Sequence, residues 1–137
     1  MKTKLQTLWV FATLNYLYCD VVTLMDPARL KGFLAGSLGG MQISQAFLLG
    51  SAVLVEIPMA MVLLSRLLPP RAGRWANLVA ASTMTIVQLG TLAVGTPAPY
   101  YLFFSCIEIA CTATIVWLAW QKPLQAVEQP YTYSGGN

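Results

Sequence analysis

The sequence contains no histidine and few charged residues. Charged side chains make up 9% of the 137 residues, whereas apolar side chains make up 57%. Soluble domains carry roughly 25% charged residues, so this composition excludes an ordinary soluble domain and is typical of a membrane protein. Without histidine, histidine-ligated haem and the usual histidine-based zinc and di-iron sites are excluded as well. We therefore expect no metal site and no cofactor.

Cysteine and basic residues are also scarce. The three cysteines, Cys19, Cys106 and Cys111, lie in apolar runs without a C-x-x-C motif, which argues against a disulfide framework and against a redox pair. The net charge is only +3, and the basic residues lie between apolar runs instead of forming a patch interleaved with aromatic residues. The expected partner is therefore the lipid bilayer and not nucleic acid.

Four apolar runs are long enough to cross a bilayer, which takes about 20 helical residues. They cover about residues 5–25, 42–67, 75–94 and 100–120, and residues 121–137 form a polar tail. The chain has room for these spans and for no soluble domain besides. We predict one all-α membrane domain over residues 1–137, a four-transmembrane-helix bundle.

A short amphipathic helix is predicted between spans 1 and 2. Asp26 is a good N-cap residue, and Pro27 suits the first helical position. Apolar and basic residues follow at helical spacing: Leu30, Phe33 and Leu34 beside Arg29 and Lys31. Such a segment is expected to lie in the membrane interface.

Glycines recur after this segment. Gly32, Gly36 and Gly40 fall four residues apart, which would give a smooth face for close helix contact. A flexible, glycine-rich entry to the next span fits equally well, because consecutive glycines such as Gly39-Gly40 break helices. Inside that next span, Pro58 predicts a hinge, since proline kinks a helix and frees the carbonyl one turn before it.

The positions of lysine and arginine predict the orientation. In a four-span protein, most basic residues fall on the side of the two termini: Lys2, Lys4, Arg66, Arg71, Arg74 and Lys122. Only Arg29 and Lys31 fall on the other side. Because cytoplasmic connections are enriched in basic residues, both termini are expected in the cytoplasm.

The strongest functional signal is an acid inside the second span. Glu56 lies in the run AFLLGSAVLVEIPMAMVLL, and an acid inside such an apolar run is costly and marks a functional site by default. At about 1.5 Å per residue, Asp20, Gln88 and Glu108 lie in the outer half of the membrane, Glu56 lies near the midplane, and Asn15 is close in depth. Polar side chains in spans face inward. We predict that these five residues form one pocket for a proton, a cation or a ligand.

Polar stripes in the third and fourth spans support inward-facing polar groups. The stripes contain Asn77, Thr85, Gln88 and Thr91 in the third span, and Ser105, Glu108, Cys111 and Thr112 in the fourth. The alternative is purely structural: the same groups hydrogen-bond between helices and set their register.

The chain also resembles a known group of proteins over nearly its whole length. The run LWVFATLNYLYCDVVTLMDP followed by LKGF, then a span with Glu56 and a last span with Glu108, is similar to an uncharacterised family of small four-span bacterial membrane proteins, loosely of the DoxX-like type. This resemblance implies a four-helix fold in a bacterial inner (plasma) membrane. It carries no established catalytic residues.

Three functions fit these observations. Acids that exchange protons inside a membrane are typical of proton relays and cation sites, so we favour proton- or cation-linked binding and transport of a small molecule by a homo-oligomer. The second hypothesis is an accessory or assembly subunit of a larger membrane complex. The third is an enzyme acting on a lipid or isoprenoid, with Glu56 and Glu108 as acid and base. The sequence offers no phosphate-binding glycine loop and no activated nucleophile, so a non-enzymatic function is favoured.

Overall fold

The computed structural model describes residues 2–38 and 40–121. These residues form helices α1 (Lys2–Met25), α2 (Pro27–Leu34), α3 (Gln45–Leu67), α4 (Pro70–Ala93) and α5 (Pro99–Trp120), and the short strands β1 (Ser37–Leu38) and β2 (Met41–Gln42). The predicted polar tail from residue 122 on, Lys122 included, lies outside the described residues.

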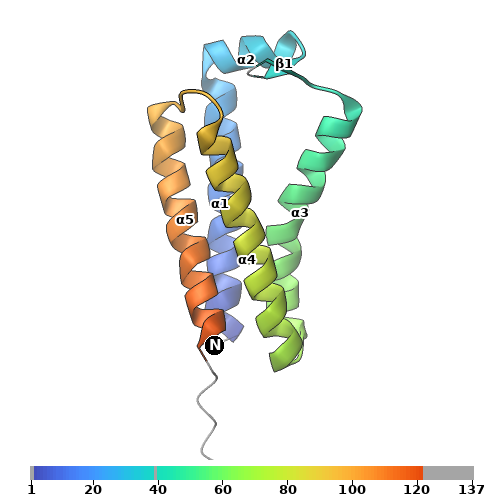
Figure 1. The fold of residues 1–137 in the computed structure, drawn as a ribbon, viewed down its shortest axis with the longest axis vertical. Coiled ribbons are helices and arrows are strands. Elements are labelled where there is room, and N and C mark those ends of the chain that lie inside the picture. The colour runs from blue at the N-terminus through green and yellow to red at the C-terminus, as the bar shows by residue number, and fades with distance from the viewer. Residues whose placement is uncertain (1, 39, 122–137) are drawn as a thin grey trace, which may run out of the picture.

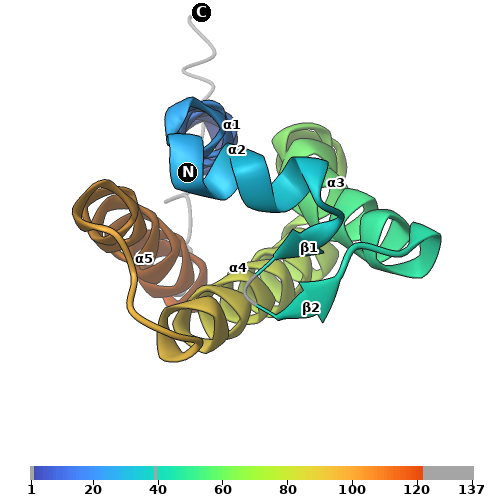
Figure 2. The ribbon, with the colours of Figure 1, turned by 90° about the horizontal axis from the view of Figure 1, so that it is seen from above.

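The four long helices form a ring in which each contacts two others. α1 packs against α3 and α5, and α4 packs against the same two helices from the other side. Figure 1 shows the bundle from the side, and Figure 2 shows α2 and the β hairpin lying across one end of it. We call this the hairpin end, and the opposite end, where α1 begins, the terminal end.

The predicted bundle of spans is confirmed. All four long helices are long and apolar enough to cross a membrane. Their bounds lie within a few residues of the predicted ones, with one clear difference: α4 begins at Pro70 and not near residue 75. Pro70 occupies the start of the helix, where a missing backbone N–H leaves no intrahelical hydrogen bond unmade. Pro69 is the cap residue before the helix, and Pro70 is its first residue.

The hairpin end begins with the predicted short helix. The Asp26 side chain caps α2 by accepting a hydrogen bond from the backbone N–H of Ala28 at 3.0 Å, and Pro27 follows it as the first helical residue. Tyr100, at the start of α5, donates its hydroxyl hydrogen to the other Asp26 carboxylate oxygen at 3.3 Å. Asp26 therefore ties this helix to the first turn of the last span.

The glycines after α2 form a turn and not a helix face. β1 and β2 pair in antiparallel fashion, and Gly36 (φ 73°) and Gly40 (φ 88°) have backbone conformations that favour glycine. Of the three glycines predicted to share a face, only Gly32 lies within α2. The expected helix-contact face of Gly32, Gly36 and Gly40 is therefore not formed, because the chain leaves the helical conformation after Leu34.

The apolar core is concentrated in the half of the bundle near the terminal end. Its centre is an apolar layer of five buried residues contributed by all four long helices: Trp9, Met61, Ala81, Met84 and Ile115. Within this layer the indole Nε1–H of Trp9 donates to Asn77 Oδ1 at 2.7 Å. The layer closes the centre of the bundle on that side.

Helix α3 joins this core with only part of its length. Its buried residues are Pro58, Met61 and Ser65, all in the half near the terminal end. The other half leans away from its neighbours toward the hairpin (Figure 1). The bundle is consequently tighter at the terminal end than at the hairpin end.

Candidate functional site

Glu108 on α5 is the one buried acid among the described residues. Its side chain is 2% exposed. Asn15 on α1 donates a hydrogen bond from Nδ2 to Glu108 Oε1 at 3.2 Å, and the same amide nitrogen donates to the backbone carbonyl of Phe104 at 3.2 Å. Asn15 therefore binds one carboxyl oxygen of Glu108 and also links α1 to α5, the helix that contains Glu108.

The second carboxyl oxygen of Glu108 has no hydrogen-bond partner within the described part of the chain. Oε2 is buried, and so is the hydroxyl oxygen of Tyr16, which also lacks a partner there. Buried polar atoms in proteins are nearly always hydrogen-bonded, because leaving one unpaired costs about 1–3 kcal/mol. An unpaired carboxyl oxygen in this setting is suited to carry a proton or to meet a cation.

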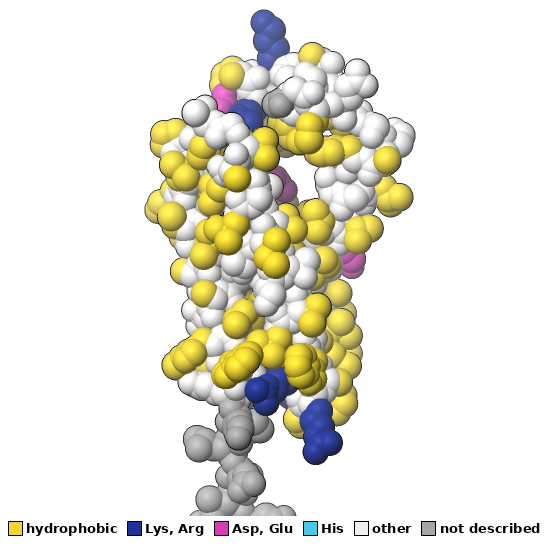
Figure 3. Space-filling view, in the orientation of Figure 1, with side chains coloured by type: hydrophobic (Ala, Val, Ile, Leu, Met, Phe, Trp, Pro, Cys, Tyr) yellow, Lys and Arg dark blue, Asp and Glu magenta, His cyan; other side chains and the backbone are white. Residues whose placement is uncertain are grey.

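Several groups lie within electrostatic range of the Glu108 carboxyl. They include the Tyr16 hydroxyl and the Cys19 thiol, both on α1. Asp20, one turn after Tyr16 on α1, lies within the same range, although its side chain is exposed. In the view of Figure 3 the molecule is hollowed between α3 and α4 below the hairpin, and acidic side-chain atoms are visible inside.

A polar seam between α4 and α5 continues from Glu108 toward the hairpin end. Gln88 Nε2 donates to Ser105 Oγ at 2.6 Å, and Ser105 lies one turn from Glu108 on the same helix. Closer to the hairpin, the Tyr101 hydroxyl donates to Thr91 Oγ1 at 2.9 Å. Thr91 is exposed, so the polar side chains of this seam extend from one turn away from Glu108 to the surface, while the Glu108 carboxyl itself is hydrogen-bonded to Asn15.

Toward the terminal end the seam continues, among the described residues, with the side chains of Thr85 and Thr112. The Thr112 hydroxyl donates to the backbone carbonyl of Glu108 at 3.0 Å, and the hydroxyls of Thr85 and Thr112 lie 2.9 Å apart. Beyond them lies the apolar layer, in which Trp9 and Ile115 are 0% exposed. Polar side chains therefore continue from the level of Glu108 toward the hairpin end, whereas the apolar layer interrupts them toward the terminal end.

Three of the five predicted pocket residues are buried in this region: Asn15, Gln88 and Glu108. Glu56 differs, since its side chain is exposed on the surface of α3. At about 100° per residue, Glu56 points roughly opposite to Pro58, Met61 and Ser65, the residues that bury α3. The prediction that Glu56 shares a pocket with Glu108 therefore does not match the structure.

Residues 1–127 match the profile of DUF6326, a family of unknown function. The chain belongs to the DUF6326 family. No curated protein and no solved structure gives a significant match. The family match agrees with the expected likeness to an uncharacterised group, and the looser DoxX-like likeness stays a prediction.

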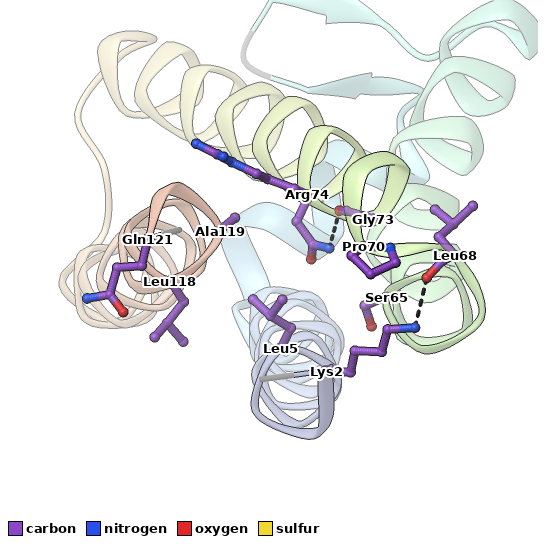
Figure 4. A pocket seen from close by; sticks show the side chains of 11 residues that line it. Lys2, Leu5, Ser65, Leu68, Pro70, Gly73, Arg74, Leu118, Ala119 and Gln121 are labelled. Carbon is purple, nitrogen blue, oxygen red and sulfur yellow. Dashed lines mark hydrogen bonds between the residues drawn. The ribbon is translucent and has the colours of Figure 1, made fainter. Parts of the chain in front are cut away.

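This DUF6326 member has a second candidate site, which sequence reasoning missed. A cavity of about 210 Å³ opens at the terminal end, and all four long helices contribute to its lining. Figure 4 shows Lys2, Leu5 and Ser65 beside Gly73, Arg74 and Ala119 around it. From the sequence, Lys2 and Arg74 predict only the orientation of the chain. Nothing in the sequence reveals that the helix ends leave a space between them.

No group of three or more Cys, Asp or Glu side chains that could hold a metal ion occurs among residues 2–38 and 40–121 of this family member. Cys19 and Cys111 are buried and Cys106 is exposed, all three as free thiols. The chemistry available at the Glu108 site is thus that of a carboxyl with amide, phenol, thiol and hydroxyl neighbours.

Proposed function

We propose that this multi-pass membrane protein binds a proton or a small cation at Glu108 and links that event to the binding and transport of a small molecule. The observation that carries the proposal is the buried Oε2 atom of Glu108, which has no partner among the described residues. Intramembrane acids are costly and mark proton relays or ion sites by default.

Asn15 holds the Glu108 carboxyl in place in both of the states that we propose, with and without a proton. With a proton on Oε2, Glu108 is neutral and Oε1 still accepts the hydrogen bond from Asn15. When the proton leaves, the carboxylate needs a compensating positive charge, because a bare charge in a dry interior is strongly disfavoured. A small cation or the cationic group of a ligand can take the place of the proton, and the two events are thereby coupled.

The polar seam supports access from the hairpin end. Hydrogen-bond donors and acceptors lie between Glu108 and the surface on four side chains: Gln88, Ser105, Thr91 and Tyr101. The apolar layer around Trp9 and Ile115 opposes passage to the terminal end. Transport then requires the layer to open; α3 contributes Met61 to the layer, and Pro58, three residues before Met61, weakens the helix there.

We propose further that both termini face the cytoplasm of a bacterial inner membrane. The terminal end carries Lys2, Lys4, Arg66, Arg71 and Arg74, whereas Arg29 and Lys31 lie in α2 at the hairpin end. This asymmetry supports a cytoplasmic terminal end by the positive-inside rule. In that orientation Glu108 exchanges protons with the outer side.

Proteoliposomes with an internal pH dye test the proposal. Imposing a Na⁺ or K⁺ gradient should change the internal pH faster than in empty vesicles, and Glu108→Gln should lower the rate to that of empty vesicles. Glu56→Gln is the matched control, because it removes an exposed carboxyl from another helix and should keep the wild-type rate. An unchanged rate in Glu108→Gln would falsify the proposal.

The accessory-subunit hypothesis is favoured by a different observation, the exposure of Glu56. Glu56 is the middle residue of α3, about 16 Å from either end at about 1.5 Å per residue, so its side chain cannot reach the membrane surface. An acid left in lipid at that depth costs about 2.5–3.5 kcal/mol. A partner helix that supplies a cation or a hydrogen-bond donor at the midplane would remove this cost.

The same two variants separate this second function from the first. A photo-crosslinker at Val53, one turn from Glu56 and 58% exposed, should give a membrane-embedded adduct with a partner helix. Glu56→Gln should weaken that adduct and Glu108→Gln should leave it intact, the reverse of the order expected for vesicle flux. An adduct with a second copy of the chain would assign the partner helix to a homo-oligomer.

The third hypothesis, acid–base chemistry on a lipid or isoprenoid, finds no support in the arrangement of the two acids. Glu56 is exposed on α3 and Glu108 is buried on α5, and these two helices are not neighbours in the ring. A catalytic acid and base must both reach one substrate.

A further inference from the structure

The cavity at the terminal end lies apart from the Glu108 site, on the other side of the apolar layer. Its volume is about 210 Å³, and its walls include Leu5, Leu68, Leu118 and Ala119. For comparison, an engineered apolar cavity of about 150 Å³ binds benzene. The space is therefore sufficient for one aromatic ring or a short branched alkyl chain.

Two buried polar side chains of the cavity wall, Asn77 and Ser65, already have partners, whereas Gln121 is exposed. Asn77 accepts from the Trp9 indole at 2.7 Å and donates from Nδ2 to the backbone carbonyl of Gly73 at 2.7 Å. The Ser65 hydroxyl donates to the Val62 carbonyl at 3.5 Å. The interior consequently offers apolar contact and little free hydrogen-bonding capacity, which favours an apolar body over a polar one.

Two cations stand at the rim of this apolar space. Lys2 Nζ donates to the backbone carbonyls of Leu68 at 2.9 Å and Arg66 at 3.3 Å, at the end of α3. Arg74 Nη2 donates to the carbonyl of Trp120 at 3.2 Å, at the end of α5. An ammonium has three donors and a guanidinium has five, so both side chains are held in place with donors to spare.

No acid balances these cations within the described part of the chain. The terminal end carries Lys2, Lys4, Arg66, Arg71 and Arg74, while the described acids are Asp20 and Asp26 toward the hairpin end and Glu56 and Glu108 within the spans. A cleft rimmed by charges of one sign attracts ligands of the opposite sign. The rim therefore selects an anion.

We propose that this cavity binds a small organic anion, a carboxylate attached to one aromatic ring or to a short branched alkyl chain. The carboxylate meets one of the two rim cations, which point away from each other in Figure 4: the Lys2 ammonium or the Arg74 guanidinium, whose fork matches the two oxygens of a carboxylate. The apolar body packs against Leu5, Leu68 and Leu118. This site does not depend on Glu108, so its test and the vesicle test can fail separately.

Calorimetric titration of the protein in lipid nanodiscs tests the ligand class, with benzoate and 3-phenylpropionate as probes. Both should bind saturably at one site per chain. Benzyl alcohol lacks the charge, benzylamine has the opposite charge and acetate lacks the apolar body, so all three should bind at least about tenfold more weakly. Equal binding of any of these three, or no saturable binding of either aromatic acid, would overturn the proposal.

Two kinds of variant locate the site. The double variant Lys2→Gln/Arg74→Gln should weaken benzoate binding at least about tenfold, whereas Arg71→Gln, which removes an exposed cation at the same end outside the cavity lining, should leave it unchanged. Benzoate binding that survives the double variant, or that Arg71→Gln weakens as strongly, would contradict the assignment.

Gly73→Leu provides a variant that fills the cavity without touching the cations. A Cβ atom at Gly73 would meet its nearest neighbour, Leu68 Cβ, at 3.6 Å, an ordinary contact, and leucine favours the helix more than glycine does. Benzoate binding should be lost while the melting temperature of the protein is kept. Retained binding in Gly73→Leu would place the ligand elsewhere and overturn the proposal.

Discussion

Glu108 owes its position to Asn15 as much as to its own helix. The Asn15 amide reaches both the carboxyl group and the Phe104 carbonyl, at 3.2 Å each, and so couples α1 to α5 at the level of the buried acid. A single donor on one carboxyl oxygen leaves the other free. In this account Asn15 is a positioning residue and Glu108 is the group that changes its charge.

Asn15→Ala should therefore lower the free energy of unfolding by about 1–2 kcal/mol, because two hydrogen bonds between spans are lost and the Phe104 carbonyl loses a donor. Reversible unfolding in mixed detergent micelles measures this. Thr114→Ala is the control, since among the described residues the Thr114 hydroxyl bonds only to the Ala110 carbonyl of its own helix, and it should change the free energy of unfolding by less than about 0.5 kcal/mol. Equal effects of the two substitutions would rule out a special role for Asn15.

Helix α3 combines two regions with different packing. From Pro58 to Ser65 it is buried against the core, and before Pro58 it has no buried residue. Pro58 has no backbone N–H to give to the Leu54 carbonyl, so the helix is weakest at the junction of these regions. The half before Pro58 is thus the element most free to move.

Pro58→Ala should stiffen this junction. Spin labels at Leu49 on α3 and Val21 on α1, both exposed, report the separation of the two helices near the hairpin end. Pulsed electron–electron double resonance should show a narrower distribution of label distances in Pro58→Ala than in the chain with native Pro58. The proton flux into vesicles should be reduced in parallel. An equally broad distribution with reduced flux would show that Pro58 acts through something other than a hinge.

The sequence predicted the elements well because their signals are local. Apolar runs of sufficient length, the cap at Asp26 and the proline after it each act within a few residues, and the structure contains the corresponding helices. Gly36 and Gly40 were harder to place, since four-residue spacing suits a helix face and positive φ suits a turn, and the sequence cannot tell which conformation the backbone adopts.

The candidate site could be predicted only where polar residues mark a face. On α5, Ser105, Glu108, Cys111 and Thr112 form one stripe, and all four are buried. On α3 the residues around Glu56 are apolar on every side, so periodicity does not reveal which face meets the other helices. That face is decided by long-range packing of Met61 and Ser65, which no local pattern encodes.

Taken as one molecule, the bundle is asymmetric along its length. A polar seam leads from Glu108 to the hairpin end, the apolar layer around Trp9 closes the middle, and a cavity rimmed by cations opens at the terminal end. The buried acid and the cationic cavity thus lie on opposite sides of the apolar layer. This arrangement agrees with the two proposals, in which Glu108 binds a proton or a cation and the cavity binds an anion.

Above all, we propose that Glu108 exchanges a proton or a cation while Glu56 serves another purpose. Infrared difference spectroscopy of the protein in lipid follows the carbonyl stretch of protonated carboxyl groups as the pH is stepped or as Na⁺ or K⁺ is added. The predicted result is a difference band that disappears in Glu108→Gln and persists in Glu56→Gln. A band that survives in Glu108→Gln at its full wild-type intensity would contradict the claim.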